Sequence, residues 1–541
     1  MAITPTTRRR SGTLFMRGGL LLAPRCRFHA AHLHAVFRRF SLPVLLIALA
    51  FAIPAGRAQT WRVTPTISWE STLTDNVNLT SERRSDWVNQ LTPSIAFHEV
   101  GAHTRLDGVV SMPVLLYART SENNQVVPLA NVAGTLEAID KFLFVDASAS
   151  VSQQFANPFG ARPSTLANAT QNRYTAQTYA VTPYLKGTAP DNISYELRDV
   201  NTWTDASALA SVVTGRSYQN EVVGNIRRQP APGGWSVEYD RTELRFAQAD
   251  ETERTEIGRV RGSYRPQPPI EVSASAGYED NRFFQTRANG ATYGAAIHWR
   301  PDPRTDLNAS WEHRFFGSGF DVSFDHTTRL STWSIHASRG ISNYPQQLGT
   351  FATGTDVSLL LNSLFANRFQ DPVQRQALVD QLIRDRGLPS VLTGPLPLLT
   401  QQITLAEAET ATLGLLGARN SVFFTLFRSR NEPIEASQND DLGALLSDIG
   451  INNTQVGANA VWTHQLGSNL TLATSVDWSR VTDNGRADAI TRIYSLRTIL
   501  SRQLSALTSV YAGLRYQNSR SNVSEGFRER AVFVGLSHMF H

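Results

Sequence analysis

The chain has 541 residues and a formal net charge of +5, from 51 lysines and arginines and 46 aspartates and glutamates. Nine of those arginines lie in the first 58 residues, which contain no acidic residue, so residues 59–541 carry 42 basic against 46 acidic side chains. The positive charge therefore belongs to the first segment and does not indicate nucleic-acid binding by the rest. The only cysteine, Cys26, lies in the same segment, which excludes disulfides and thiol chemistry from residues 59–541.

The first 58 residues have the order of a secretory signal peptide. Arg38 and Arg39 precede an apolar run from Leu42 to Ile53, and small residues follow up to Ala58. This order of positive, apolar and small residues is typical of export signals, and a run of 12 residues is short for a membrane-spanning helix. We expect cleavage after Ala58, which gives a signal peptide at 1–58 and an exported chain at 59–541.

Short segments in which apolar and polar residues alternate recur through the exported chain. Strand side chains point alternately to the two faces of a sheet, so such segments predict strands with one apolar and one polar face. We find no apolar run long enough for a transmembrane helix and no repeat of about 40 residues that would indicate a propeller. The clearest apolar sets are Trp61, Val63, Ile67 and Trp69; Ile270, Val272, Ala274, Ala276 and Tyr278; and Val510, Ala512, Leu514 and Tyr516.

The connections between these segments are alternately short and long. Short ones at 187–191, 230–234, 265–269, 300–304 and 467–469 contain proline, glycine or asparagine, whereas longer polar loops include 75–85, 155–171 and 317–325. Outer-membrane barrels have short periplasmic turns and long outer loops. The sequence therefore predicts an all-β fold, a transmembrane antiparallel up-and-down β-barrel of about 20 strands with both termini in the periplasm.

Aromatic residues at strand ends would form the interfacial girdles of such a barrel, with the apolar face toward lipid. The alternative is a soluble secreted β protein in which these aromatics fill a core. They are Trp61, Trp69, Trp235, Tyr239, Tyr278, Trp311, Trp462, Trp478 and Tyr516.

One segment, 355–389, departs from the strand pattern. Thr355 or Asp356 can cap a first helix, and Asp371, Pro372 and Gln374 form a helix start that Gly387 and Pro389 end. We expect a helical hairpin there, which counting of the strands places in the periplasm. It would serve as a periplasmic contact, as a partial plug of the lumen, or as a cap on the rim.

The chain ends on an alternating strand that resembles the assembly signal of outer-membrane barrels. Val532, Val534, Leu536 and Phe540 share one face, with Gly535 and Phe540 at matching spacing, although His538 replaces the usual apolar residue. We expect this strand to engage the barrel-assembly machinery and to close the barrel against Trp61–Trp69. Deleting Phe540 and His541 should then impair assembly.

Charged residues on the polar faces would point into the barrel. Such charges line an aqueous channel or pair into structural ladders, and pairing is the expected role of each. No catalytic residues, metal ligands, cofactor-binding motif or phosphate loop stand out, so the sequence predicts none of these sites. The inward charges are Arg62, Glu70, Glu196, Arg198, Glu238, Asp240, Glu271, Glu312, Arg314, Asp477 and Arg515; His464 and His538 are expected near the rim, and Asp440 and Asp441 in an outer loop.

Four short motifs resemble those of the PEP-CTERM system-associated outer-membrane protein family. They are Thr74-Asp75-Asn76-Val77, Asp371-Pro372-Val373-Gln374-Arg375, Gly387-Leu388-Pro389 and Gly417-Ala418-Arg419-Asn420. The resemblance implies a bacterial outer-membrane barrel from a locus for exopolysaccharide production and exosortase-dependent sorting. It supplies no molecular activity.

The function expected from the sequence is that of a non-enzymatic outer-membrane barrel in exopolysaccharide export or assembly, as channel or scaffold. The partners would be outer-membrane lipid, the assembly machinery and periplasmic export components, and no nucleic acid. A porin-like diffusion channel and a barrel hydrolase acting on lipid or polysaccharide are the alternatives.

Overall fold

The computed structural model describes residues 60–207, 215–247, 252–283, 287–343, 357–365, 403–434, 452–486 and 488–540, and single residues between 366 and 402. The predicted signal peptide, Asp440 and Asp441, and the predicted helix boundaries at Asp371–Gln374, Gly387 and Pro389 lie outside these residues. No helix in the described part is both long and apolar enough to cross a membrane.

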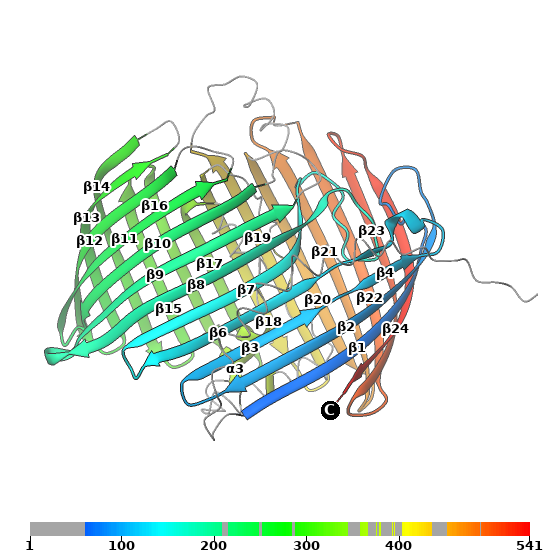
Figure 1. Ribbon diagram of the computed structural model, residues 1–541, viewed down its shortest axis with the longest axis horizontal. Helices are drawn as coiled ribbons and strands as arrows, with labels where there is room; N and C mark the ends of the chain where they lie inside the picture. The colour runs from blue at the N-terminus through cyan, green and yellow to red at the C-terminus, as the bar shows by residue number, and fades with distance from the viewer. Residues whose placement is uncertain are drawn as a thin grey trace, which may run out of the picture. The chain divides into compact units, whose positions relative to one another are not determined.

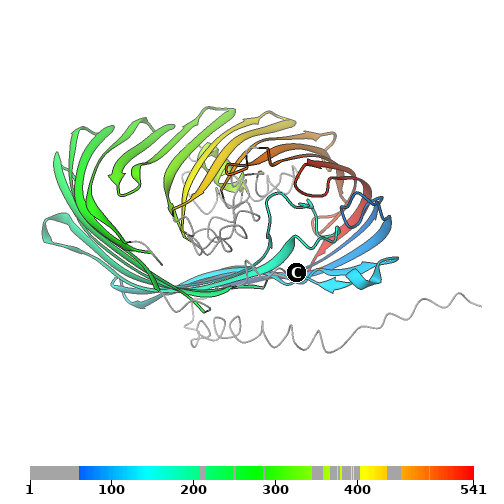
Figure 2. The same ribbon diagram turned by 90° about the horizontal axis from the view of Figure 1, so that it is seen from above.

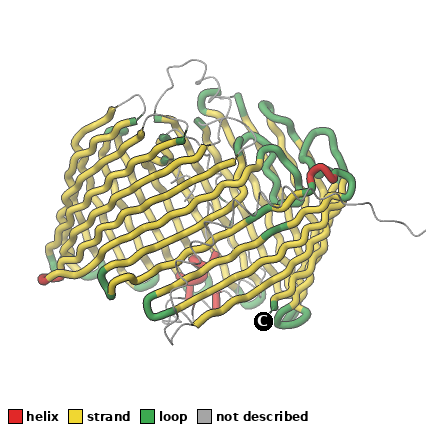
Figure 3. The backbone as a smooth tube through the Cα atoms, in the orientation of Figure 1, coloured by secondary structure: helices red, strands yellow, loops and turns green. Residues whose placement is uncertain are grey.

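The described part consists almost entirely of long antiparallel strands (Figures 1 and 3). They are β1 (Thr60–Thr74), β2 (Asp86–Val100), β3 (Thr104–Ser111), β4 (Val114–Tyr117), β5 (Gln125–Val126), β6 (Leu129–Ile139), β7 (Leu143–Phe155), β8 (Arg173–Ala189), β9 (Ile193–Ser207), β10 (Gly215–Arg228), β11 (Gly233–Phe246), β12 (Thr252–Gln267), β13 (Ile270–Arg282), β14 (Arg287–Asp302), β15 (Thr305–Arg314), β16 (Gly317–Thr327), β17 (Ser331–Ser342), β18 (Thr404–Leu416), β19 (Asn420–Pro433), β20 (Asn453–Gln465), β21 (Leu470–Asp483), β22 (Ile490–Gln503), β23 (Thr508–Ser521) and β24 (Phe527–Met539). The helices are η1 (Ser121–Asn123), η2 (Pro190–Asn192) and α3 (Val357–Phe365).

These strands form a single closed sheet, because β24 pairs with β1 from Thr66↔Met539 to Thr74↔Ala531 (Figure 2). The 24 segments make 22 strands across the barrel wall. The difference arises because β3 continues as β4 and β6 as β5, each interrupted next to a proline, Pro113 or Pro128, which has no N–H for the ladder. The predicted all-β antiparallel barrel is confirmed, with 22 strands instead of about 20.

The two ends of the barrel differ in their connections. At one end, here the tight-turn end, connections have two to four residues; at the other, the long-loop end, most are longer, with 17 residues at 156–172, 19 at 434–452 and 61 at 343–403. Both described chain ends lie at the tight-turn end, since Thr60 pairs with Val100 beside the turn at 101–103 and Met539 N donates to Leu507 O. An even number of strands requires this.

The prediction of a long loop at 317–325 is wrong, because this segment is strand β16. Its glycines and serines suggested a loop, but Phe320, Val322 and Phe324 alternate along it and pair with β15 and β17. The connection before it contains only Phe315 and Phe316.

Because the sequence predicts a loop where β16 lies, the strand count places the helical insertion 355–389 at the wrong end of the barrel. The connection 343–403 joins β17 to β18 at the long-loop end, so the periplasmic placement by strand counting is wrong. Its helix α3 nevertheless lies deep in the barrel, where Val357 and Leu361 pack on Phe423 and Val461, close to the tight-turn end. Beyond α3, Arg375, Leu378 and Val379 are helical, and the hairpin itself stays a prediction.

The alternation of side chains is as the sequence predicts. On β1, Trp61, Trp69 and Leu73 point outward and are exposed, whereas Thr72 and Thr74 point inward and are buried. Seven of the nine predicted girdle aromatics are exposed, and Trp478 and Tyr516 are half-buried on the same outer face. An apolar outer face around a polar interior is the arrangement of an outer-membrane barrel, in which lipid covers the outer face.

Aromatic rings cover glycines on the inner face of the closing strands. A Cβ on Gly535 would lie 2.3 Å from the ring of Tyr511, whose hydroxyl donates to Glu70 of β1 over 2.9 Å. Only glycine therefore fits beneath this ring without displacing it.

Gly535→Val should accordingly destabilise the barrel by about 1–3 kcal/mol, the usual cost of overpacking. Gly258→Val is the control, because open space surrounds that glycine. Urea unfolding in detergent micelles and heat-modifiable gel migration measure both variants. Equal stability of the two would contradict the assigned role of the ring.

Candidate functional site

The connection 156–172, here the lumen loop, folds into the barrel from the long-loop end. It leaves β7 and returns to β8, yet it reaches the wall formed by β21–β24, which Figure 2 shows as a crossing of the lumen. The carbonyl of Phe159 accepts hydrogen bonds from Thr491 and Ser524, and Arg162 Nη2 donates to Ser479 Oγ over 3.1 Å. The loop therefore closes off one sector of the lumen.

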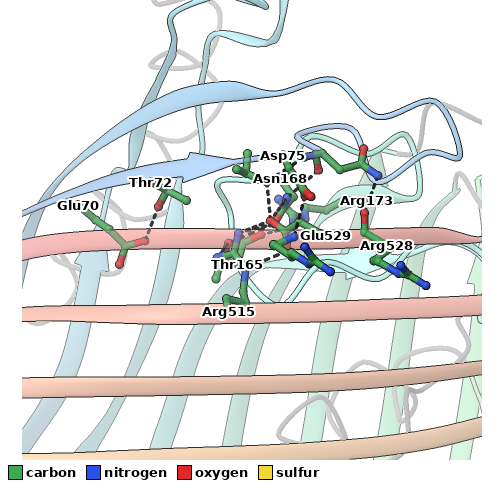
Figure 4. A network of polar contacts seen from close by, with 12 residues as sticks. Glu70, Thr72, Asp75, Thr165, Asn168, Arg173, Arg515, Arg528 and Glu529 are labelled. Carbon is green, nitrogen blue, oxygen red and sulfur yellow. Dashed lines mark hydrogen bonds and ion pairs between the residues drawn. The ribbon is translucent and has the colours of Figure 1, made fainter.

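A buried ion pair anchors the far side of the lumen loop (Figure 4). Arg515 of β23 and Glu529 of β24 are almost inaccessible to water, and Arg515 Nη2 lies 2.6 Å from Glu529 Oε1. Asn168 bridges both, because its Oδ1 accepts from Arg515 Nη2 at 3.0 Å and its Nδ2 donates to Glu529 Oε1 at 2.9 Å. Thr165 Oγ1 accepts a hydrogen bond from Arg515 Nη1. Thr74 Oγ1 of β1 donates one to Glu529 Oε1.

This network satisfies two buried charges that would otherwise be costly. A guanidinium and a carboxylate taken out of water stabilise a fold only when their remaining hydrogen-bonding groups are also satisfied. Loop residues supply part of that satisfaction here. The barrel closure at β1–β24 and the position of the lumen loop are therefore coupled through Glu529.

The base of the lumen loop is fixed by a second set of contacts. Ala169 N donates to Val77 O over 2.9 Å, and Asn172 bonds Asn157 and Ala161 within the loop. A small apolar cluster underlies this base and joins it to β2 and β4. Its buried members are Val77, Val88, Leu115, Tyr117, Val127 and Ala167.

Arg162 brings a positive charge into the lumen. Burial lowers the pKa of its guanidinium to about 10, which still leaves it cationic at neutral pH. Its Nη2 bonds Ser479, while its Nε has no hydrogen-bond partner among the described residues. No carboxylate of the described part pairs with it, so the crossing segment is locally positive.

The inner wall away from β21–β24 carries paired charges. Arg198 bonds Asp146 at 3.3 Å and Glu196 at 3.0 Å, so charges on β7 and β9 pair along the inner face. Glu279 is fully buried and accepts from Arg314 Nη2 at 2.8 Å and from the N–H of Phe315. These pairs give a polar wall in which most charges have a partner, while among the described residues the inward Glu221 and Asp240 are bonded only by Gln219 and Thr242.

One pair spans two intervening strands. Arg259 of β12 bonds Glu312 of β15 at 2.6 and 3.0 Å, across the inward positions Gly277 and Gly294. A Cβ at Gly277 would lie 2.2 Å from the carbonyl of Gly258, and one at Gly294 2.5 Å from that of Trp311. Because Gly277 and Gly294 have no side chain, neighbouring backbones approach closely there. The side chains of Arg259 and Glu312 can therefore meet across the two strands between them.

The inward charges predicted from sequence are mostly paired, as expected. Glu238 meets Arg261, Glu271 meets Arg265, and Asp477 accepts from Asn459 and Ser495. Asp240 accepts a long bond from Thr242, whereas Arg62 has no side-chain partner among the described residues. His464 and His538 lie at the tight-turn rim, as predicted.

Sequence reasoning missed Glu529, Asn168 and Thr165. Glu529 stands between Arg528 and Arg530, so it looked like part of a charged strand end, although the inward alternation of Phe527, Ala531 and Phe533 includes it. Asn168 and Thr165 belong to a loop that appeared merely polar. Their partners are more than 340 residues away in sequence.

Among the described residues, one group could in principle hold a metal ion. Ligand atoms of His103, Glu137 and Asp140 lie within 4.8 Å of one another, at two neighbouring tight turns. His103 and Asp140 are exposed, and Glu137 already pairs with His103 and Lys141. The group resembles an ordinary polar turn.

Comparison with known proteins gives similarity in fold only. No family model matches the chain, and no curated protein matches it. Among solved structures, it is similar to the FrpB iron transporter of Neisseria meningitidis (8% identity, TM-score 0.47, 88% of this chain and 81% of that one) and to the siderophore receptor PirA of Acinetobacter baumannii (10%, 0.46, 89% and 81%). It is also similar to the outer membrane channel DcaP of Acinetobacter baumannii (7%, 0.31, 90% and 99%). Such values assign neither a family nor a function.

The buried ion pair generates a stability prediction. Arg515→Leu or Glu529→Leu alone should lower the free energy of unfolding by about 3–5 kcal/mol, because each leaves an unpaired buried charge. The double variant should lose clearly less than the sum of the two single losses. Urea unfolding of the four proteins measures this coupling, and additive losses would show that the pair is not the anchor.

Proposed function

We propose that this protein is a non-enzymatic outer-membrane conduit for hydrophilic material, narrowed by its own lumen loop. The observation that carries the proposal is the polar, ion-paired inner wall of β9–β15, beside a lumen loop that occupies the sector of β21–β24. Barrels of this size enclose space for water. In the part of the chain that the structure describes, the lumen loop, α3 and the residues Val379 and Leu392 packed against α3 enter that space.

The material we propose is exopolysaccharide, or its precursors, on the way to the cell surface. A wall of paired charges and amides offers many hydrogen-bonding groups, which suits uncharged, hydroxyl-rich chains. The four short motifs that resemble the PEP-CTERM-associated family agree with this substrate class. A general porin-like diffusion channel is the coarser form of the same proposal.

Export and assembly complete the proposal. The segment 1–58 would direct secretion and be removed, and the β24 strand would engage the assembly machinery. The tight-turn end would then face the periplasm, where export components could dock. We assign no enzymatic role, and we take the ion pairs Arg314–Glu279 and Arg515–Glu529 as structural.

Ion conductance in planar bilayers tests the conduit. Replacement of 159–169 by a short glycine–serine linker should raise single-channel conductance, because it removes the segment that crosses the lumen. The control carries the linker in the tight turn 504–507, which joins β22 and β23 outside the lumen.

Three proteins decide between conduit and scaffold: the natural protein, the variant with the shortened lumen loop, and one that lacks 354–389. Conductance in at least the shortened variants supports the conduit. Absence of conductance in all three, with folded protein verified by heat-modifiable migration, would contradict it and leave a scaffold role.

A further inference from the structure

Five arginines gather on the outer face of the barrel at the long-loop end, outside the lumen. Arg480, Arg492 and Arg520 lie directly opposite one another on β21, β22 and β23, and Arg528 and Arg530 follow on β24. The register places them on the face that carries Trp478, Tyr494 and Leu514, which is the lipid-facing side. We call these five residues the arginine patch.

On the described strands β20–β24, the arginine patch has no counter-charges on its own face. The only carboxylates in β20–β24 are Asp477, Asp483 and Glu529, and all three point into the lumen. Within the described ranges, no arginine of the patch forms a side-chain hydrogen bond or an ion pair. Of the nearby loop carboxylates, Asp75 pairs with Arg83 and accepts from the main-chain N–H of Arg530, and Glu525 accepts from Ser81. Asp488 forms no ion pair with an arginine of the patch.

Outward arginines elsewhere on the barrel are neutralised by neighbours. Arg241 pairs with Glu243, Arg254 with Glu256, and Arg428 with Glu407 at 2.9 Å. Like charges directly opposite on neighbouring strands are destabilising, so an unbalanced row of three calls for an anion from outside the chain. The buried Nε of Arg480 has no hydrogen-bond acceptor among the described residues, which also indicates an external anion.

The height of the arginine patch matches that of a lipid headgroup. Arg480 stands two residues beyond Trp478, and Arg492 two residues beyond Tyr494, toward the long loops. Aromatic residues of this kind mark the membrane interface. Two strand residues span about 6–7 Å, which places the guanidinium groups just outside the apolar layer.

An apolar groove runs beneath the arginine patch. It has a volume of about 700 Å³ and is lined by Leu73, Leu496, Leu514, Tyr516, Val532 and Arg530 among others. Leu73, Leu496, Leu514, Tyr516 and Val532 give the groove its apolar, lipid-facing lining. Asp75, Arg119 and Arg530 line it toward the long-loop end, at the headgroup height. An acyl chain in the groove would therefore bring its headgroup to the guanidinium groups.

We propose that the arginine patch and this groove bind a lipid with a phosphorylated headgroup, of the lipid A type, in the outer leaflet. Arginine binds phosphate with paired, charge-assisted hydrogen bonds, which suits this partner better than a neutral headgroup. An extended row of guanidinium groups favours a headgroup with more than one phosphate. The groove is lined by residues of β1 and β24, so a bound lipid would also stabilise the pairing of these two strands.

Lipid retention by the purified full chain tests the site. The probes are lipid A and enzymatically dephosphorylated lipid A, added in detergent micelles and measured by native mass spectrometry. The test variant is Arg480→Gln/Arg492→Gln/Arg520→Gln, and the matched control is Arg241→Gln/Arg254→Gln/Arg428→Gln, whose arginines are already paired. Heat-modifiable migration verifies that both variants are folded.

The test variant should lose at least about tenfold in affinity for lipid A, since each hydrogen bond to a charged group is worth roughly that much or more. The control should bind as the natural protein does, and the dephosphorylated lipid should bind the natural protein and the test variant equally weakly. Equal binding of lipid A by test variant and natural protein would overturn the proposal. Full displacement of lipid A by an equal concentration of inorganic phosphate would also overturn it, because the site would then be for free anions.

Discussion

Closure of the sheet by the pairing of β24 with β1 is the constraint on which the rest of the structure depends. Within a lipid layer, an unpaired backbone N–H or C=O has no water to bond, so a spanning sheet must have no open edge. Nine register pairs between Thr66–Thr74 and Ala531–Met539 remove that edge. They also bring Glu529 beside Thr74. Tyr511 of the neighbouring β23 covers Gly535 of β24 and donates to Glu70 of β1, so closure and interior packing depend on the same three strands.

Closure places one face of every strand in the barrel interior and the other face on the outside. Charged residues are accommodated differently on the two faces. Inside, most charges form ion pairs or are bridged by amide side chains, and one pair, Arg259–Glu312, reaches across glycine positions, because the barrel wall offers neighbours at short range. Outside, lipid accepts the apolar residues, and the strands extend past the apolar layer at the long-loop end, where charged residues appear. The carboxylates there balance the arginines on most of the circumference, and they are missing on β20–β24. Most interior charges of the described wall are paired, whereas the arginine patch on the exterior has no partner of opposite charge on β20–β24, which makes it the candidate binding surface.

The fold could be predicted because strands follow from local sequence alternation. The site could not, because its residues are far apart in the sequence. Period-two alternation and proline-containing turns identify strands such as β1, β13 and β23 without knowledge of their partners. The glycine-rich start of β16 was mistaken for a loop, because Gly317–Asp325 contains the residues of a turn but is held extended by pairing with β15 and β17. The anchoring of Asn168 on Arg515 and Glu529 could not be predicted, since nothing local to residue 168 indicates a partner across the lumen. Inward charges such as Glu312 could be identified, but their specific partners depend on register and curvature.

The central claim is that lipid lies on one face of each strand and water on the other. Residues 59–541 contain no cysteine, so single cysteines at Ser275 and Ala276 of β13 can be compared directly. In intact outer membranes, a membrane-impermeant, water-soluble thiol reagent should modify the cysteine at Ser275, which points into the lumen, and leave that at Ala276 protected by lipid. Equal modification of both positions would contradict a membrane-embedded barrel, and protection of both would contradict a water-filled lumen.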